Sequence, residues 1–184
     1  MTGVKMVFAH DTESALVQAA ALVNTPLDDI AALDAFLRDH PDSGVRAGTR
    51  RELDEVRALR PRFRRFWELD EDELVETVNA LLRESNPLPQ LVRHDDWPYH
   101  LHAISRDAPL AERMTVEAAM ALVDVVRAEA LDRLRVCAYP GCGNVLVDLS
   151  KNRSKRFCDG GCGNRAAVSA YRARRAALIQ SPEP

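Results

Sequence analysis

Four cysteines constrain this chain more than any other feature, because all of them lie within 26 of its 184 residues. They form two close pairs, Cys137-x4-Cys142 and Cys158-x3-Cys162, separated by 15 residues. Two short pairs on either side of a loop are typical of a structural zinc site, since each turn can supply two thiolates to one tetrahedral ion. We therefore predict that these four cysteines bind one Zn²⁺.

Other uses of the thiols stay open at this stage. They could form two disulfides, remain four free buried thiols, or hold an iron–sulfur cluster, which four thiolates also suit. The chain starts at Met1 without a basic segment followed by an apolar one, so we expect a cytoplasmic protein, in which disulfides are disfavoured. No apolar run approaches the ~20 residues of a membrane span, so we expect no membrane partner.

The residues around the second cysteine of each pair repeat. Gly141-Cys142-Gly143-Asn144 recurs as Gly161-Cys162-Gly163-Asn164. A glycine after the second cysteine can take a positive φ, which would turn backbone N–H groups toward sulfur. A helix predicted from about 164 to 179 would begin beside Cys162 and favour its thiolate. The candidates for such supporting contacts are Gly143, Asn144, Gly163, Asn164 and Arg165.

Charge is divided unevenly along the chain. Residues 131–180 hold ten Lys and Arg against three Asp and Glu, whereas residues 1–130 hold 15 against 24. Some basic residues near the cysteines, Arg165 first, can balance the negative charge of four thiolates around zinc. The others lie on one loop and one helix, which favours contact with phosphates over a merely solvated basic face. The candidates for nucleic-acid contact are Lys151, Arg153, Lys155, Arg156, Arg172, Arg174 and Arg175.

The first 130 residues predict a mostly helical domain with its own apolar core. The expected helices are 11–23, 28–40, 49–67, 70–85 and a last one from 109 or 115 to 131. Thr49 to Glu52 fits a capping box at the start of the third helix, and Pro61 should kink or divide that helix. Weak alternation at 90–93 and 99–104 predicts a β-hairpin.

These elements predict an α+β protein. A helical domain with a small β-hairpin would occupy residues 1–132, and a treble-clef-like or ribbon-like zinc finger ending in a helix would occupy 133–180. Residues 181–184 would form a disordered tail. The last helix of the first domain leads directly into the cysteine segment, which favours a rigid connection, although we expect the two cores to be separate.

The stretch from Cys137 to Arg175 resembles the CGNR zinc-finger domain. The naming tetrad is present as Cys162-Gly163-Asn164-Arg165, a short apolar strand ends in Asp148, and Phe157 precedes the third cysteine. In this family the finger follows a mostly helical ABATE domain, whose opening motif is similar to Leu22-Val23-Asn24-Thr25. The resemblance covers essentially the whole chain.

The resemblance implies a bacterial, stress-related transcription regulator whose cysteines are zinc ligands and whose finger binds DNA. We therefore expect a DNA-binding transcription regulator, with an N-terminal domain that senses a small-molecule effector or forms a homodimer. The alternative is a zinc-stabilised module that binds protein or RNA without reading a DNA sequence.

Three histidines, His94, His100 and His102, are the remaining candidates for chemistry. On a strand, His100 and His102 would share a face, as metal-binding pairs can. A solvated or partly buried hairpin face explains them more simply. The sequence has no Gly-rich phosphate loop, nucleophile elbow or HExxH motif. We therefore expect no enzymatic activity.

Overall fold

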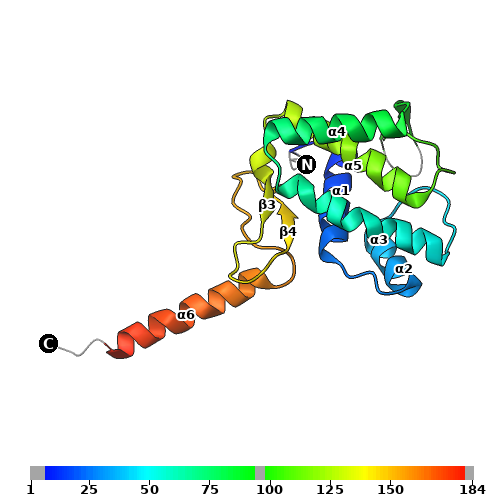
Figure 1. Cartoon of the computed structure of the whole chain (residues 1–184). Coiled ribbons are helices and arrows are strands. Elements are labelled where there is room, and N and C mark those ends of the chain that lie inside the picture. The colour runs from blue at the N-terminus through cyan, green and yellow to red at the C-terminus, as the bar shows by residue number, and fades with distance from the viewer. Residues whose placement is uncertain (1–6, 94–97, 181–184) are drawn as a thin grey trace.

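The computed structural model describes residues 7–93 and 98–180, with backbone alone for 177–180. Within these ranges it has six α-helices, two short 3-10 helices and two antiparallel pairs of strands, which confirms the predicted α+β class. Five helices form a compact body, while the last helix projects from it (Figure 1). The predicted tail at 181–184 and His94 lie outside the described residues.

The α-helices of the body are α1 (His10–Asn24), α2 (Ile30–Asp39), α3 (Arg50–Arg64), α4 (Glu71–Ser85) and α5 (Leu110–Arg127). The strands are β1 (Gln90–Val92), β2 (His100–His102), β3 (Leu134–Val136) and β4 (Val145–Val147). The 3-10 helices are η1 (Arg65–Trp67) and η2 (Leu131–Arg133), and the last helix is α6 (Cys162–Gln180). None of the helices within the described ranges combines the length and the apolar character that a membrane span requires.

The body is held by large apolar side chains that its helices bury against one another. Leu22 of α1, Leu53 of α3, Leu74 of α4 and Leu122 of α5 are each 2% exposed or less. Burial of one such side chain stabilises the fold by about 1.5–3 kcal/mol. This shared core explains why α5 contacts α1, α3 and α4 extensively and why α1 also contacts α3.

Helix α3 departs from two local predictions. Thr49 accepts a hydrogen bond from Glu52 N (3.2 Å), but the Glu52 carboxylate turns instead to Ala47 N and Gly48 N, both at 3.0 Å. The capping box is therefore only half formed. The helix also continues through Pro61 to Arg64, so the predicted division there is wrong. Proline disfavours the interior of a helix, but Pro61 lies on the exposed face of α3, and packing of the opposite, buried face outweighs this effect.

Other ends of elements follow ordinary capping chemistry. Asp70 and Glu73 form a complete capping box at the start of α4. Helix α5 ends at Arg127, four residues earlier than predicted, because Glu129 adopts a left-handed conformation with φ of 50°. The predicted hairpin is confirmed, since β1 pairs antiparallel with β2 and Gln90 lies opposite His102.

A buried ion pair fixes the long loop after α2. Asp42 and Arg113 contact each other with side chains only 2% and 3% exposed, and Arg113 also donates to Val45 O (3.1 Å). Gly44 lies directly against this guanidinium, so close that an added Cβ would lie 2.2 Å from Arg113 Cζ. The loop therefore needs glycine at this position.

The structure has two buried clusters, as predicted, but they are not independent, because β4 contributes to both. Alternate residues of β4 face opposite sides: Val145 and Val147 pack among the helices, while Leu146 packs against the cysteines. Asn24 of α1 bonds both backbone groups of Val145, and Trp67 Nε1 donates to Leu146 O at 2.9 Å. A division of the chain near residue 132 remains a proposal.

Candidate metal centre

One cysteine of each pair adjoins a regular element, and the other lies in a turn or loop. Cys137 directly follows β3, and its N–H donates to Asn144 O at 2.8 Å, which extends the pairing of β3 with β4. Cys142 lies in the connecting turn, where its N–H donates to Tyr139 O at 3.0 Å. Cys158 precedes α6 and Cys162 begins it, two residues earlier than predicted. A strand pair followed by a helix thus brings both pairs together.

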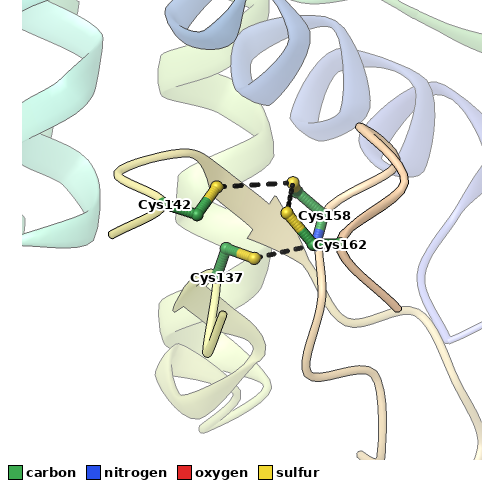
Figure 2. A group of neighbouring side chains, drawn as sticks. All are labelled: Cys137, Cys142, Cys158 and Cys162. Atoms are coloured by element: carbon green, nitrogen blue, oxygen red, sulfur yellow. Dashed lines mark hydrogen bonds between the residues drawn. The ribbon is translucent and has the colours of Figure 1, made fainter. Parts of the chain in front are cut away.

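The four sulfur atoms face one another (Figure 2) and lie within 4.8 Å of each other. Cys158 Sγ is 3.8 Å from Cys142 Sγ and 3.6 Å from Cys162 Sγ. Four thiolates bound tetrahedrally at ~2.3 Å from a zinc ion would be separated by ~3.8 Å, whereas a disulfide requires ~2.05 Å. The donor set therefore fits one tetrahedral metal ion and does not match two disulfides.

Burial disfavours the charged, thiolate form of the cysteines, so four thiolates at this site require a nearby positive charge. Cys162 is fully buried, and Cys137 and Cys158 are each 6% exposed. Burial raises the pKa of the Cys162 thiol to about 12, against the opposing effect of Arg165. At Cys137 burial also opposes ionisation, but backbone N–H groups of Cys158 and Tyr139 lower the pKa to about 7. A metal ion would supply the positive charge that the buried thiolates lack.

Two of the predicted supporting residues contact sulfur. Arg165 Nη2 donates to Cys162 Sγ at 2.8 Å and to Gly160 O at 3.3 Å. Its guanidinium lies 5.0 Å above the Tyr139 ring, which fixes its orientation. Asn144 Nδ2 donates to Cys158 Sγ at 3.6 Å. These contacts place donors beside the metal centre, where they orient the ligands.

The positive φ occurs two residues earlier in each repeat than predicted, before the second cysteine instead of after it. Gly141 and Gly161, which precede the second cysteines, have φ of 75° and 77°, whereas Gly143 and Gly163 lie outside the left-handed region. The chain reverses direction just before the second cysteine of each pair, and glycine adopts the left-handed conformation needed there without strain. Gly163 lies in α6 beside the Phe157 ring. Asn164 is exposed and donates no hydrogen bond to a cysteine within the described ranges.

The loop between the cysteine pairs is organised by Asp148, which sequence reasoning did not single out as a site residue. Its carboxylate is fully buried and accepts hydrogen bonds from Ser150 N (2.9 Å) and Lys155 N (3.0 Å). Arg135 lies 3.1 Å from the same carboxylate. These interactions hold the pKa of Asp148 below its usual range, although burial opposes ionisation. The Asp-x-Ser spacing, typical of a turn closed by a side chain, was the available signal.

The predicted nucleic-acid residues divide into two groups. In the loop, Arg153 pairs with Asp132 (2.7 Å), Lys155 pairs with Asp159 (3.1 Å), and Arg156 lies 5.8 Å from the centre of the Phe157 ring. The second group is exposed and makes no ion pair within the described ranges; it consists of Lys151, Arg172, Arg174 and Arg175. The three arginines lie along the projecting α6 (Figure 1).

The predicted histidine pair lies in the body and not at the cysteines. His100 and His102 share a face of β2, with their Nε2 atoms 3.0 Å apart. Within residues 7–93 and 98–180, the four cysteines are the only group of three or more potential ligands close enough to hold one metal ion. The histidines line a separate cavity, described below.

Two profiles of known protein families match the chain. Residues 17–129, more than half of its length, match ABATE, which carries the description "Putative stress-induced transcription regulator". Residues 133–175 match the CGNR zinc finger. No protein of curated function matches the chain. Both families and their order along the chain agree with the resemblance that the sequence motifs indicated.

Proposed function

The chain belongs to the ABATE family and carries a CGNR zinc finger, and from this we propose that it is a DNA-binding transcription regulator in which Cys137, Cys142, Cys158 and Cys162 hold one Zn²⁺. The proposed role is regulatory, not enzymatic. The observation that carries the proposal is the geometry of α6. This helix begins at Cys162 and projects from the body (Figure 1). Its basic side chains at Arg172, Arg174 and Arg175 are exposed.

Zinc would have a purely structural task in this arrangement. The ion would fix the first turn of α6 through Cys162, while Arg165 in the same turn holds that thiolate. The 19 residues of α6 span about 28 Å, and an α-helix fits the major groove of B-DNA. A helix fixed at one end and free along the rest can approach a duplex without obstruction by the body.

The basic side chains fit contact with phosphates. At ~100° per residue, Arg172 and Arg175 lie on one side of α6 and Arg174 on another. Lys151 and Arg156 add exposed charges from the loop. Arg153 and Lys155 are engaged in exposed ion pairs, which contribute only about 0–1 kcal/mol each and can be exchanged for phosphate contacts.

A salt titration of duplex binding tests this proposal. The full-length zinc-loaded protein should bind with a log–log slope of about −0.9 per neutralised phosphate. The double reversal Arg172→Glu/Arg175→Glu should flatten the slope by about two units without changing zinc content. The matched control is Arg38→Glu/Arg83→Glu, two exposed arginines of α2 and α4, which changes net charge equally. Absence of binding at low salt across a random-sequence pool would contradict the proposal.

The alternative, a zinc-stabilised module that binds protein or RNA, is favoured by one observation. Val168 and Tyr171, three residues apart on α6, are 48% and 57% exposed. Apolar side chains at this spacing suit a groove on a protein partner. If Val168→Ser/Tyr171→Ser leaves the salt slope of duplex binding unchanged yet abolishes regulation in cells, the helix serves a partner in addition to DNA.

A further inference from the structure

A cavity of about 480 Å³ lies in the helical body and shares no residue with the metal centre. Its wall is formed by α1, α5, β2 and the loop at 41–43. The volume is within the usual 300–1,000 Å³ of small-molecule sites. Apolar side chains cover much of the wall, namely Ala15, Leu101, Met120, Ala121 and Val123.

One carboxyl group in this wall has no hydrogen-bond or ion-pair partner among the described residues. Glu117 of α5 is partly buried and lines the cavity. Asp42 and Asp11 oppose its negative charge, while Arg113 favours it. No hydrogen bond or ion pair to Glu117 forms within the described part of the chain, and Arg113 is already engaged by Asp42. A carboxyl that is partly withdrawn from water and lacks a donor among the described residues gains free energy from a ligand that supplies one.

The other charged groups leave the cavity with an excess of negative charge. Asp124 accepts a hydrogen bond from Thr12 Oγ1 at 2.5 Å, and Asp11 accepts one from Leu101 N at 3.0 Å. Arg127 is exposed at the end of α5 and is the sole lysine or arginine in the described wall. The wall therefore combines apolar surface with carboxylates that outnumber the cations near them.

We propose that this cavity binds a small organic cation, with an ammonium or guanidinium group against Glu117 and an apolar frame against the alanine and methionine side chains of α1 and α5. A charge-assisted hydrogen bond would satisfy the unpartnered carboxyl, and the apolar wall would bury the rest of the ligand. Burial, then the charges of Asp42 and Asp11, raise the pKa of Glu117 to about 7. A bound cation would favour the ionised form. The proposal does not depend on DNA binding.

Three matched probes distinguish charge from apolar fit in calorimetric titration of the full-length, zinc-loaded protein. They are phenethylamine, neutral 2-phenylethanol and anionic phenylacetate. The amine should bind at least about ten-fold more tightly than the alcohol, and phenylacetate more weakly than both. Glu117→Gln should abolish the preference of amine over alcohol. Glu112→Gln, an exposed position on the same helix, should retain it.

Two further measurements locate the site. Ala15→Leu, which narrows the cavity from α1, should weaken all three probes. From pH 6 to pH 8 the amine should bind several-fold more tightly, because Glu117 ionises in this range. The other titratable and charged groups that face Glu117 in and around the cavity are Asp11, Asp42, Asp124, Arg113, Arg127, His100 and His102.

Several outcomes would overturn the proposal. They are equal binding of the three probes, a preference for the amine that survives in Glu117→Gln, and no binding of the amine at millimolar concentration. Duplex binding measured on the same samples reports separately on the proposed regulator, so failure of one proposal leaves the other intact.

Discussion

The helical body and the finger (residues 133–180) are stabilised by different means. In the body, leucines and phenylalanines from several helices bury one another almost completely. In the finger, the buried cluster consists of Leu146 and three cysteines, with Tyr139, Cys142 and Phe157 partly buried around it. So small an apolar cluster cannot offset the entropy of ordering the chain, and a metal ion is the usual substitute. The comparison shows that one chain can combine a fold built on apolar burial with one built on ligation.

The two parts nevertheless meet along β4, which serves both. Its two valines belong to the core of the body, while Leu146 and the cysteines belong to the finger. Arg64 of α3 also donates to Gly143 O in the turn before β4. Loss of metal from the finger should therefore also lower the stability of the body. Three variants compare the two parts and test this coupling.

Loss of the metal should have the largest effect. Cys158→Ser leaves three thiolates, and the apparent binding energy of a structural zinc, about 10–16 kcal/mol, contributes to folding of the finger. We expect zinc content to fall to near zero and hydrogen-exchange protection to disappear from β3 and the first turns of α6. Helices α1 to α5 should stay folded but less stable, because Val145 and Val147 lose their anchor.

Elemental analysis and hydrogen exchange followed by mass spectrometry measure this outcome. Ser169→Ala, an exposed position on α6, is the control and should behave as the wild type. Retained protection of α6 without metal would show that the finger folds on apolar contacts, and the contrast between the two parts would then be false.

A smaller effect should follow from breaking the ion pair of the body. Arg113→Met leaves the buried Asp42 carboxylate without its cation and with only the Gly44 N–H (2.9 Å) as a remaining described donor, which should cost about 3–5 kcal/mol in urea unfolding. Asp42→Asn added to this variant should recover part of the loss. Arg51→Met removes an exposed pair with Glu55 and should cost less than about 1 kcal/mol. Zinc content should be unchanged in all of them; loss of zinc from Arg113→Met would mean that the body also holds the metal site together.

How much the sequence predicts differs between the two parts for a physical reason. The metal centre could be located from spacing alone, because its ligands are close in sequence and their chemistry is specific. The cavity could not, since Asp11, Glu117 and His100 lie far apart along the chain and meet only through packing of α1, α5 and β2. A ligand site of this kind has no local signature.

Predictions from local sequence failed in α3, where other contacts competed with the expected ones. Glu52 fits a capping box, but its carboxylate accepts hydrogen bonds from Ala47 N and Gly48 N instead. Pro61 should interrupt a helix, but α3 buries Val56, Leu59 and Phe63 around it and continues. The apolar run Val145-Leu146-Val147 forms a strand that is buried on both faces, against the body on one side and the cysteines on the other.

The smallest of the three effects concerns the junction itself, at Asn24. This residue belongs to the segment that resembles the opening motif of the ABATE domain, and the structure shows what its side chain does. Nδ2 donates to Val145 O at 2.8 Å and Oδ1 accepts from Val145 N at 2.9 Å, as a neighbouring strand would. Val145 is 1% exposed, so water cannot replace either bond. Asn24→Ala should therefore cost about 2 kcal/mol.

The informative measurement at Asn24 is a thermodynamic cycle with metal removal. If Asn24 transmits the state of the finger to the body, chelation should lower the urea stability of the body by less in Asn24→Ala than in the wild type, because the connection is already cut. Asn24→Asp should behave like the alanine variant or worse, since a carboxylate oxygen would then face Val145 O. Asn152→Ala, an exposed asparagine of the finger loop, should leave the cycle unchanged. An equal loss on chelation in wild type and Asn24→Ala would show that the coupling runs through the valines of β4 and not through this side chain.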